Sequence, residues 1–244
     1  MLFLHGNSSS KEVFFNQMNH LELNNHNLVS LDLPGHGSSD NLKSLESYTI
    51  DYYSKIVGDF IDQLKLQNII LVGHSLGAHV ATKYATSKPL IGLFNIQNTP
   101  LNSVANIEYA LNQNHLFSSF FSGSFQKESM VKLKKILVVN EEVSHNFLQD
   151  FYKTDPKCRD DLLKYIQSNP TLNEISFLSA FEPPFKLIIG RQDVFCNQHY
   201  LENLSAIRDK ISFIDNCAHY PMLERPNIFS TMLFDFIDRC NIQN

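Results

Sequence analysis

The chain has 244 residues and a mass of 28.0 kDa, which is enough to bury a substantial core in one α/β domain, with or without an insertion. Its hydrophobic fraction of 43% and charged fraction of 18% are those of an ordinary globular protein. The formal net charge of −5 gives no reason to expect a nucleic acid or an acidic membrane as a partner. No apolar run approaches the length of a membrane span, so none is expected.

The cysteines and histidines do not suggest a metal site or a secreted scaffold. Four cysteines are scattered without metal-ligand spacing, and no H-E-x-x-H motif is present. Reduced thiols in a cytosol are the default expectation for such a pattern, and residues 1–4 lack the charged lead of a signal peptide. We therefore expect a cytoplasmic protein with no metal and no cofactor.

Short apolar runs alternate with helical segments along the first hundred residues. Strands are predicted at residues 2–4, 28–31, 69–72 and 90–96. Helices are predicted from the serines at 8–10 to about Leu23, from a Thr49 cap to about Leu66, and over 78–88. This alternation predicts a mostly parallel sheet with helices on both faces.

The composition shifts between about residues 100 and 182. This stretch is rich in Asn, Ser, Lys and Phe, has helical spacing, and contains no confident buried strand. We interpret it as a helical insertion into a core formed by residues 1–99 and 183–244, because Pro183-Pro184 cannot continue a helix. The core then resumes with strands at 185–189 and 211–214, a helix over 198–208 and a final helix opened by Pro226.

The most informative stretch is the turn Gly73-His74-Ser75-Leu76-Gly77, between the predicted strand and the predicted helix. A G-x-S-x-G turn at that place forces its central residue into a strained backbone conformation and needs small residues beside it. It holds the serine hydroxyl clear of the sheet at a helix N-terminus, which favours a developing oxyanion. Ser75 is therefore the candidate nucleophile.

Other chemically useful residues follow the ends of strands. Asn7, Ser75, Asp193 and His219 each come just after a predicted strand, and ligands of parallel sheets bind at that edge. A serine nucleophile needs a base such as His219, and the base needs a carboxylate such as Asp193. The backbone N–H groups of Asn7 and Leu76 are the candidate oxyanion donors.

Taken together, these motifs resemble those of the α/β-hydrolase family. The resemblance rests on His5-Gly6-Asn7, on residues 32–39 with their Pro34-Gly35-His36-Gly37 turn, on the G-x-S-x-G turn, on Gly190-Arg191-Gln192-Asp193 and on residues 218–226. It implies a helical cap at 100–182 over the active site, and structural roles for His5 and the 34–37 loop. Two strands that usually precede the first one are absent from this sequence: either the protein lacks this edge hairpin or its start is assigned too late, and in the second case the cytoplasmic expectation loses support. An exposed sheet edge there favours self-association, so a homo-oligomer is also an expectation.

Several assignments stay open at the level of sequence. Asp193 is also a plausible helix N-cap, and Asp215 is a weaker substitute for the acid. The predicted pocket residues are His74 and an aromatic helix face, Phe117, Phe120, Phe121 and Phe125. Core packing of the cap is the favoured interpretation of those phenylalanines.

The motifs predict a serine hydrolase that cleaves an ester, or a related acyl bond, of a small and mostly apolar substrate through an acyl-enzyme. Two alternatives remain. One is a carbon–carbon bond hydrolase or lyase on the same scaffold, for which Arg159 is a candidate to hold a substrate carboxylate. The other is a ligand-binding receptor without catalysis, which an intact Ser-His-Asp set disfavours.

Overall fold

The computed structural model describes residues 1–23, 25–43, 47–102, 110–111, 121–122, 127–140, 142–143, 147–168 and 173–242. Within these residues a single six-stranded sheet has the order β2-β1-β3-β4-β5-β6, and every pair of neighbouring strands is parallel. The strands are β1 (Leu2–Leu4), β2 (Val29–Leu31), β3 (Ile70–His74), β4 (Gly92–Ile96), β5 (Phe185–Gly190) and β6 (Ile211–Ile214). All six predicted strands are present, with ends within two residues of the predicted ones.

The order of the strands places one crevice at the middle of the sheet. The chain passes from β1 outward to β2 and then returns to the other side of β1 to form β3. Parallel sheets bind ligands where the strand order reverses in this way, beyond the carboxyl ends of the two strands concerned. Those ends lead directly into Asn7 after β1 and Ser75 after β3.

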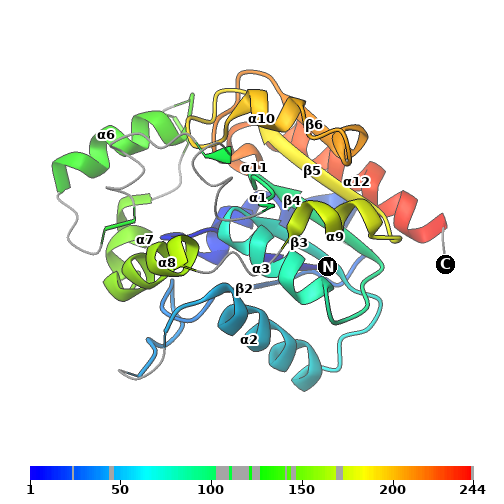
Figure 1. The fold of residues 1–244 in the computed structure, drawn as a ribbon, viewed down its shortest axis with the longest axis horizontal. Coiled ribbons are helices and arrows are strands. Elements are labelled where there is room, and N and C mark those ends of the chain that lie inside the picture. The colour runs from blue at the N-terminus through cyan, green and yellow to red at the C-terminus, as the bar shows by residue number, and fades with distance from the viewer. Residues whose placement is uncertain are drawn as a thin grey trace.

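Alternate residues of the strands divide the core into two layers. Leu71 of β3 and Leu93 of β4 pack in the cluster that contains the apolar faces of α2 (Ile50–Gln63) and α3 (Leu76–Ala85). Their neighbours Val72 and Phe94 face the other way, into a cluster with η1 (Lys11–Phe14) and α12 (Pro226–Ile242). Because both faces are covered, the strands are apolar without alternation, as their sequences predicted (Figure 1).

Two predicted helices are divided or shortened in the structure, and the same residue type stands at both ends. The helix expected to reach Leu23 is divided into η1, α1 (Phe15–Met18) and η2 (Leu21–Leu23), and the one expected over 198–208 is α10 (Gln198–Glu202) followed by turns and η4 (Arg208–Lys210). An asparagine follows each early end. Asn19 Nδ2 donates to the Phe15 carbonyl at 2.8 Å, and Asn203 Nδ2 donates to the His199 carbonyl at 2.7 Å. In each case the same carbonyl also accepts the backbone N–H of the asparagine at 3.2 Å, so side chain and backbone share one acceptor at the end of the helix.

The Thr49 cap is present as predicted. Its Oγ1 accepts the Tyr52 N–H at 3.1 Å and satisfies one of the free donors at the start of α2. Ser10 precedes η1, but its side chain does not cap that helix. It donates instead to Asp150 Oδ2 at 2.8 Å.

Between β4 and β5, the described residues form helices and add no strand to the sheet. These are α6 (Lys127–Leu137), α7 (Phe147–Lys153), α8 (Pro156–Ser168) and α9 (Glu174–Ala180). In Figure 1, α6, α7 and α8 gather at the left, toward which the β5 arrow points. That residues 100–182 form a cap as a unit of their own stays a prediction. The last part of the chain adds α11 (Pro221–Glu224) before α12.

None of the helices in the described ranges is long and apolar enough to cross a bilayer. A search of the same residues finds no group of three or more His, Cys, Asp or Glu side chains arranged to hold a metal ion.

Candidate active site

The turn after β3 has the strained geometry that its sequence predicts. Ser75 has φ 50° and ψ −114°, and its N–H donates to the Ile96 carbonyl at 2.8 Å. Close backbone approach explains both glycines. A Cβ at Gly77 would lie 2.2 Å from the Leu4 carbonyl oxygen, and one at Gly73 would lie 2.5 Å from the Gly77 oxygen. The surrounding structure therefore fixes Ser75 at the N-terminus of α3.

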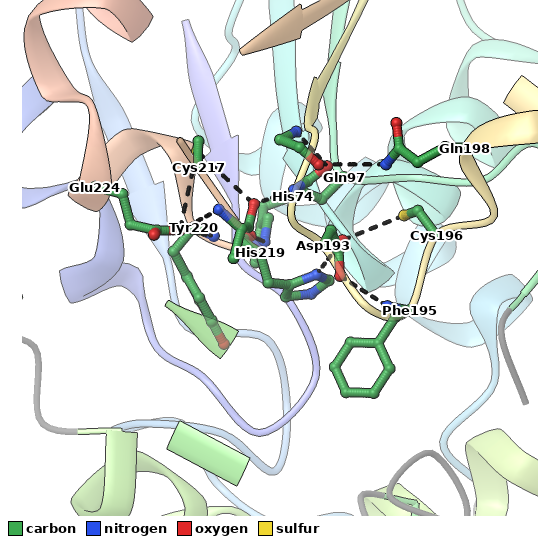
Figure 2. A network of polar contacts seen from close by, with 12 residues as sticks. His74, Gln97, Asp193, Phe195, Cys196, Gln198, Cys217, His219, Tyr220 and Glu224 are labelled. Atoms are coloured by element: carbon green, nitrogen blue, oxygen red, sulfur yellow. Dashed lines mark hydrogen bonds and ion pairs between the residues drawn. The ribbon is translucent and has the colours of Figure 1, made fainter. Parts of the chain in front are cut away.

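His219 and Asp193 form a buried hydrogen-bonded pair. His219 Nδ1 lies 2.8 Å from Asp193 Oδ2, and the two side chains are 6% and 0% exposed (Figure 2). Burial alone would raise the pKa of Asp193, but the charge and hydrogen bond of His219, with further bonds from Phe195 N–H and Cys196 Sγ, hold it below the usual value. Asp193 therefore stays a carboxylate that can fix the histidine tautomer and stabilise an imidazolium.

Backbone contacts on both sides hold the loop that carries His219. The N–H of His219 donates to the Leu137 carbonyl at 2.9 Å, at the end of α6. The carbonyl of His219 accepts a 2.8 Å bond from Nε2 of His74. Burial and then the neighbouring His219 hold the pKa of His74 well below its ordinary value, so His74 is a neutral imidazole that donates through Nε2.

Glu224 makes the most extensive set of contacts to this loop. Its Oε1 accepts the N–H groups of Ala218 at 2.9 Å and Tyr220 at 3.2 Å, on either side of His219 (Figure 2). Its Oε2 accepts the N–H of Val139 at 2.6 Å, just after α6. The carboxylate therefore joins the histidine loop to the helical segment between β4 and β5.

Gln97 links three strand ends. It follows β4 with φ 48°, its Nε2 donates to the Ala218 carbonyl, and its Oε1 accepts the Gly190 N–H at 3.0 Å. The side chain that follows β4 is therefore an amide that braces both the loop of Asp193 and the loop of His219.

Ser75 and His219 line the same cavity, which has a volume of about 80 Å³. Asn7 and Leu76 line it too. The backbone N–H groups of Asn7 and Leu76 make no hydrogen bond to any described residue. Leu76 is the first residue of α3, and the first N–H groups of a helix have no helical acceptor, so this N–H is available to a ligand. The rest of the lining is mostly apolar: Ile50, Leu101, Leu111, Phe121, Leu162, Ile166 and Phe195, with His79, Gln97, Thr99 and Cys196.

The pocket predictions have a mixed outcome. Phe121 lines the cavity. Phe117, Phe120 and Phe125 lie outside the residues that the structure describes. His74 is not a lining residue, and its prediction as one is wrong: its ring is fully buried beneath the His219 loop, where it serves the His219 carbonyl.

Neither the substitute acid, Asp215, nor the candidate for holding a substrate carboxylate, Arg159, has the contacts that its role requires. Asp215 is 79% exposed and pairs with Arg191 Nε at 3.1 Å. Arg159 is buried on the face of the Phe151 ring, 4.0 Å from its centroid, and donates to Ser8 Oγ and two backbone carbonyls. It is absent from the cavity lining, so the structure offers no support for a substrate carboxylate there.

The sequence analysis did not predict the residues that hold Asp193 and the His219 loop in place. Cys196 reads as an inert buried thiol, yet its Sγ donates to Asp193 Oδ2 at 3.2 Å. Glu224 reads as part of a family motif, and only its place five residues after His219 hinted at a role near the base. Gln97 gave no signal except that it follows a buried strand.

The six-stranded parallel sheet covered by helices on both faces defines the class of this protein by its architecture: it has the α/β-hydrolase fold. Residues 1–91 match the family model described as the alpha/beta hydrolase fold. The crystal structure of the N-acyl homoserine lactonase AidH complexed with N-butanoyl homoserine superimposes with a TM-score of 0.89 at 22% identity, covering 98% of this chain and 88% of that one.

Curated relatives extend the comparison along the chain. A Mycoplasma genitalium protein named "Putative esterase/lipase 2" is 26% identical over 254 residues, which cover 99% of this chain and 90% of the relative. The monoacylglycerol lipase ABHD6 of Bos taurus is 26% identical over 253 residues, covering 97% of this chain and 74% of that protein. The predicted fold class and the predicted resemblance to α/β hydrolases are thereby confirmed.

Proposed function

We propose that this carboxylic ester hydrolase works through Ser75, His219 and Asp193 and an acyl-enzyme intermediate. One observation carries the proposal: the strained Ser75 and the ring of His219, whose other nitrogen is paired with the buried Asp193, line one cavity. The names of the esterase and lipase relatives support the same reaction class.

In the first half of the reaction, Ser75 Oγ attacks the ester carbonyl while His219 Nε2 takes its proton. The carbonyl oxygen becomes an oxyanion, for which the N–H groups of Asn7 and Leu76 are the proposed donors. Each such donor typically contributes a factor of about 10²–10³ in rate. Asp193 stabilises the imidazolium through Nδ1–H, at the 2.8 Å contact.

The intermediate then collapses and the alcohol leaves with the proton from His219, so the acyl group stays on Ser75. In the second half, His219 takes a proton from water, and the resulting hydroxide equivalent attacks the acyl-enzyme. The carboxylic acid and free Ser75 are the products. No external oxidant, reductant or metal enters these steps.

The proposed substrate is a small, mostly apolar ester. The cavity is narrow, and Leu101, Leu162 and Phe195 give it an apolar wall. The helices α6 to α9 are proposed to form the cap over it, and the cytosol is the proposed location. Carbon–carbon hydrolysis is the weaker candidate, because Arg159 does not face the cavity. A non-catalytic receptor would need neither base nor acid.

The test is a panel of p-nitrophenyl esters of increasing acyl length, with an N-acyl homoserine lactone as a further ester. Wild type is expected to hydrolyse the short members, and Ser75→Ala to lose at least about 10³-fold in kcat. The matched control is Ser87→Ala, which removes a hydroxyl two residues beyond the C-terminal end of α3, where it donates to the Tyr84 carbonyl at 3.4 Å. Equal turnover by wild type and Ser75→Ala would contradict the proposed nucleophile.

A further inference from the structure

A second pair of ionisable side chains borders the cavity, and the reaction does not use it. His79 follows Ser75 by four residues in α3, so one helical turn places both on the same face, and His79 lines the cavity. Its Nδ1 lies 2.8 Å from Oε1 of Glu174. Glu174 belongs to α9, 95 residues away along the chain.

Glu174 is held in place on every side that the structure describes. Its Oε2 accepts the Leu101 N–H at 2.9 Å, and its own N–H donates to the Leu101 carbonyl at 2.9 Å. Its side chain is only 3% exposed. A buried carboxylate fixed in this way sets the orientation of the imidazole bonded to it, as Asp193 does for His219.

The described hydrogen bonds of the His79 ring all involve one nitrogen, and His79 lines the cavity. Nδ1 is occupied by Glu174, with Asn98 Nδ2 3.1 Å away. Nε2 makes no hydrogen bond to any described residue, and the side chain is 20% exposed. Burial lowers the pKa of His79, but the charge and hydrogen bond of Glu174 raise it more, so the balance lies above its ordinary value and favours a ring that presents an Nε2–H donor.

This donor is placed in a mostly apolar part of the wall. Ile50, Leu76 and Leu101 are among the lining residues of the same cavity. An apolar acyl chain that displaced water there would leave the Nε2–H of His79 without an acceptor, which is unfavourable. An oxygen on the acyl chain would accept a hydrogen bond from this N–H instead. The acyl group stays on Ser75 after the alcohol has left, and we assign the cavity that Ser75 and His79 both line to this acyl group.

We propose that His79, oriented by Glu174, is a specificity-determining residue that binds an oxo group on the acyl chain of the substrate. The preferred substrates are then oxoacyl esters rather than plain alkanoyl esters. This inference rests on the proposed ester hydrolysis at Ser75, and it refines the substrate class. A purely structural brace between α3 and α9 would change stability without changing the preference between the two kinds of ester.

The experiment compares matched p-nitrophenyl esters at pH 6.5: pentanoate with 4-oxopentanoate, and hexanoate with 5-oxohexanoate. The quantity measured is the ratio of kcat/KM for the oxo ester to that for the plain ester. Comparing this ratio between variants cancels the intrinsic reactivity of each ester. We expect the ratio for at least one pair to fall about 10-fold or more in His79→Phe, with partial recovery in His79→Gln, which keeps an N–H donor. A ratio that stays within about twofold of wild type for both pairs in His79→Phe would overturn the proposal.

Binding separates this inference from the hydrolase proposal. Calorimetry on Ser75→Ala measures the affinity for the same esters without turnover. Tighter binding of an oxo ester, lost in Ser75→Ala/His79→Phe, supports recognition by His79 even if wild type hydrolyses neither ester. Equal affinities for the two kinds of ester, or no detectable binding of either, would overturn recognition even where hydrolysis by Ser75 stands.

Discussion

Replacing Glu224 by glutamine tests how the base is held. The carboxylate accepts three N–H groups, from Val139 at 2.6 Å, Ala218 at 2.9 Å and Tyr220 at 3.2 Å. Glutamine keeps one acceptor oxygen and turns an NH₂ group toward the remaining N–H. A buried donor left without an acceptor costs about 1–3 kcal/mol, and the partly exposed site of Val139 places the expected loss near 2 kcal/mol.

For a chain of this size, about 2 kcal/mol corresponds to a fall in Tm of about 4–8 °C. Because the bond from Val139 ties Glu224, and through it the His219 loop, to the end of α6, we also expect its loss to lower kcat for a short p-nitrophenyl ester about 10-fold or more. Thermal unfolding followed by circular dichroism and steady-state kinetics measure the two effects.

The matched control is Glu202→Gln, which removes a half-exposed carboxylate paired with Arg191 at 3.1 Å. Exposed pairs of this kind contribute about 0–1 kcal/mol, so Tm and kcat should stay close to wild type. If Glu224→Gln leaves both Tm and kcat within the range of Glu202→Gln, then the carboxylate does not hold the histidine loop and the reasoning is wrong.

The remaining predictions concern the acid and the glycine beside the histidine loop. Asp193→Asn should lower kcat about 10³–10⁴-fold, measured with the same ester, because the amide cannot stabilise an imidazolium. The pKa of Asp193 is lowered by folding, so its contribution to stability is present above its ordinary value of 3.8 and is lost as pH falls through the lower folded value. Melting scans from pH 6 to pH 3 should accordingly show a shallower decline for Asp193→Asn than for wild type, and parallel declines would contradict the shift. Gly190→Ala should lower Tm, since its Cβ would lie 2.2 Å from the Ala218 carbonyl oxygen, whereas Gly58→Ala, with its nearest contact at 3.5 Å, should leave Tm unchanged or raise it.

The sheet was predictable because its strands are continuous apolar runs. β3 and β4 are buried on both faces, so no alternation obscured them, and the turn residues after each strand marked its end. Helix ends were less predictable. Asn19 and Asn203 lie at two of these ends, where the side-chain amide shares a carbonyl with its own backbone N–H, and asparagine favours such local bonds over continued helix.

The candidate site divides in the same way. The hydrogen bond between His219 and Asp193 could be predicted because both residues follow parallel strands that end at one edge. The pair of His79 and Glu174 could not be, since 95 residues and a helical segment without strand signals separate them. The buried position of His74 was missed because its place beside Ser75 suggested the cavity, whereas β3 ends at His74 and the chain turns sharply at Ser75, which has φ 50°.

The central claim is that Ser75 is an activated nucleophile, and covalent labelling tests it most directly. Wild type treated with a fluorophosphonate should gain one adduct in the intact mass, and peptide mapping should locate that adduct on Ser75. Labelling should slow strongly in His219→Ala, because the serine then lacks its base. An unlabelled wild-type protein, or an adduct on any residue other than Ser75, would contradict the mechanism.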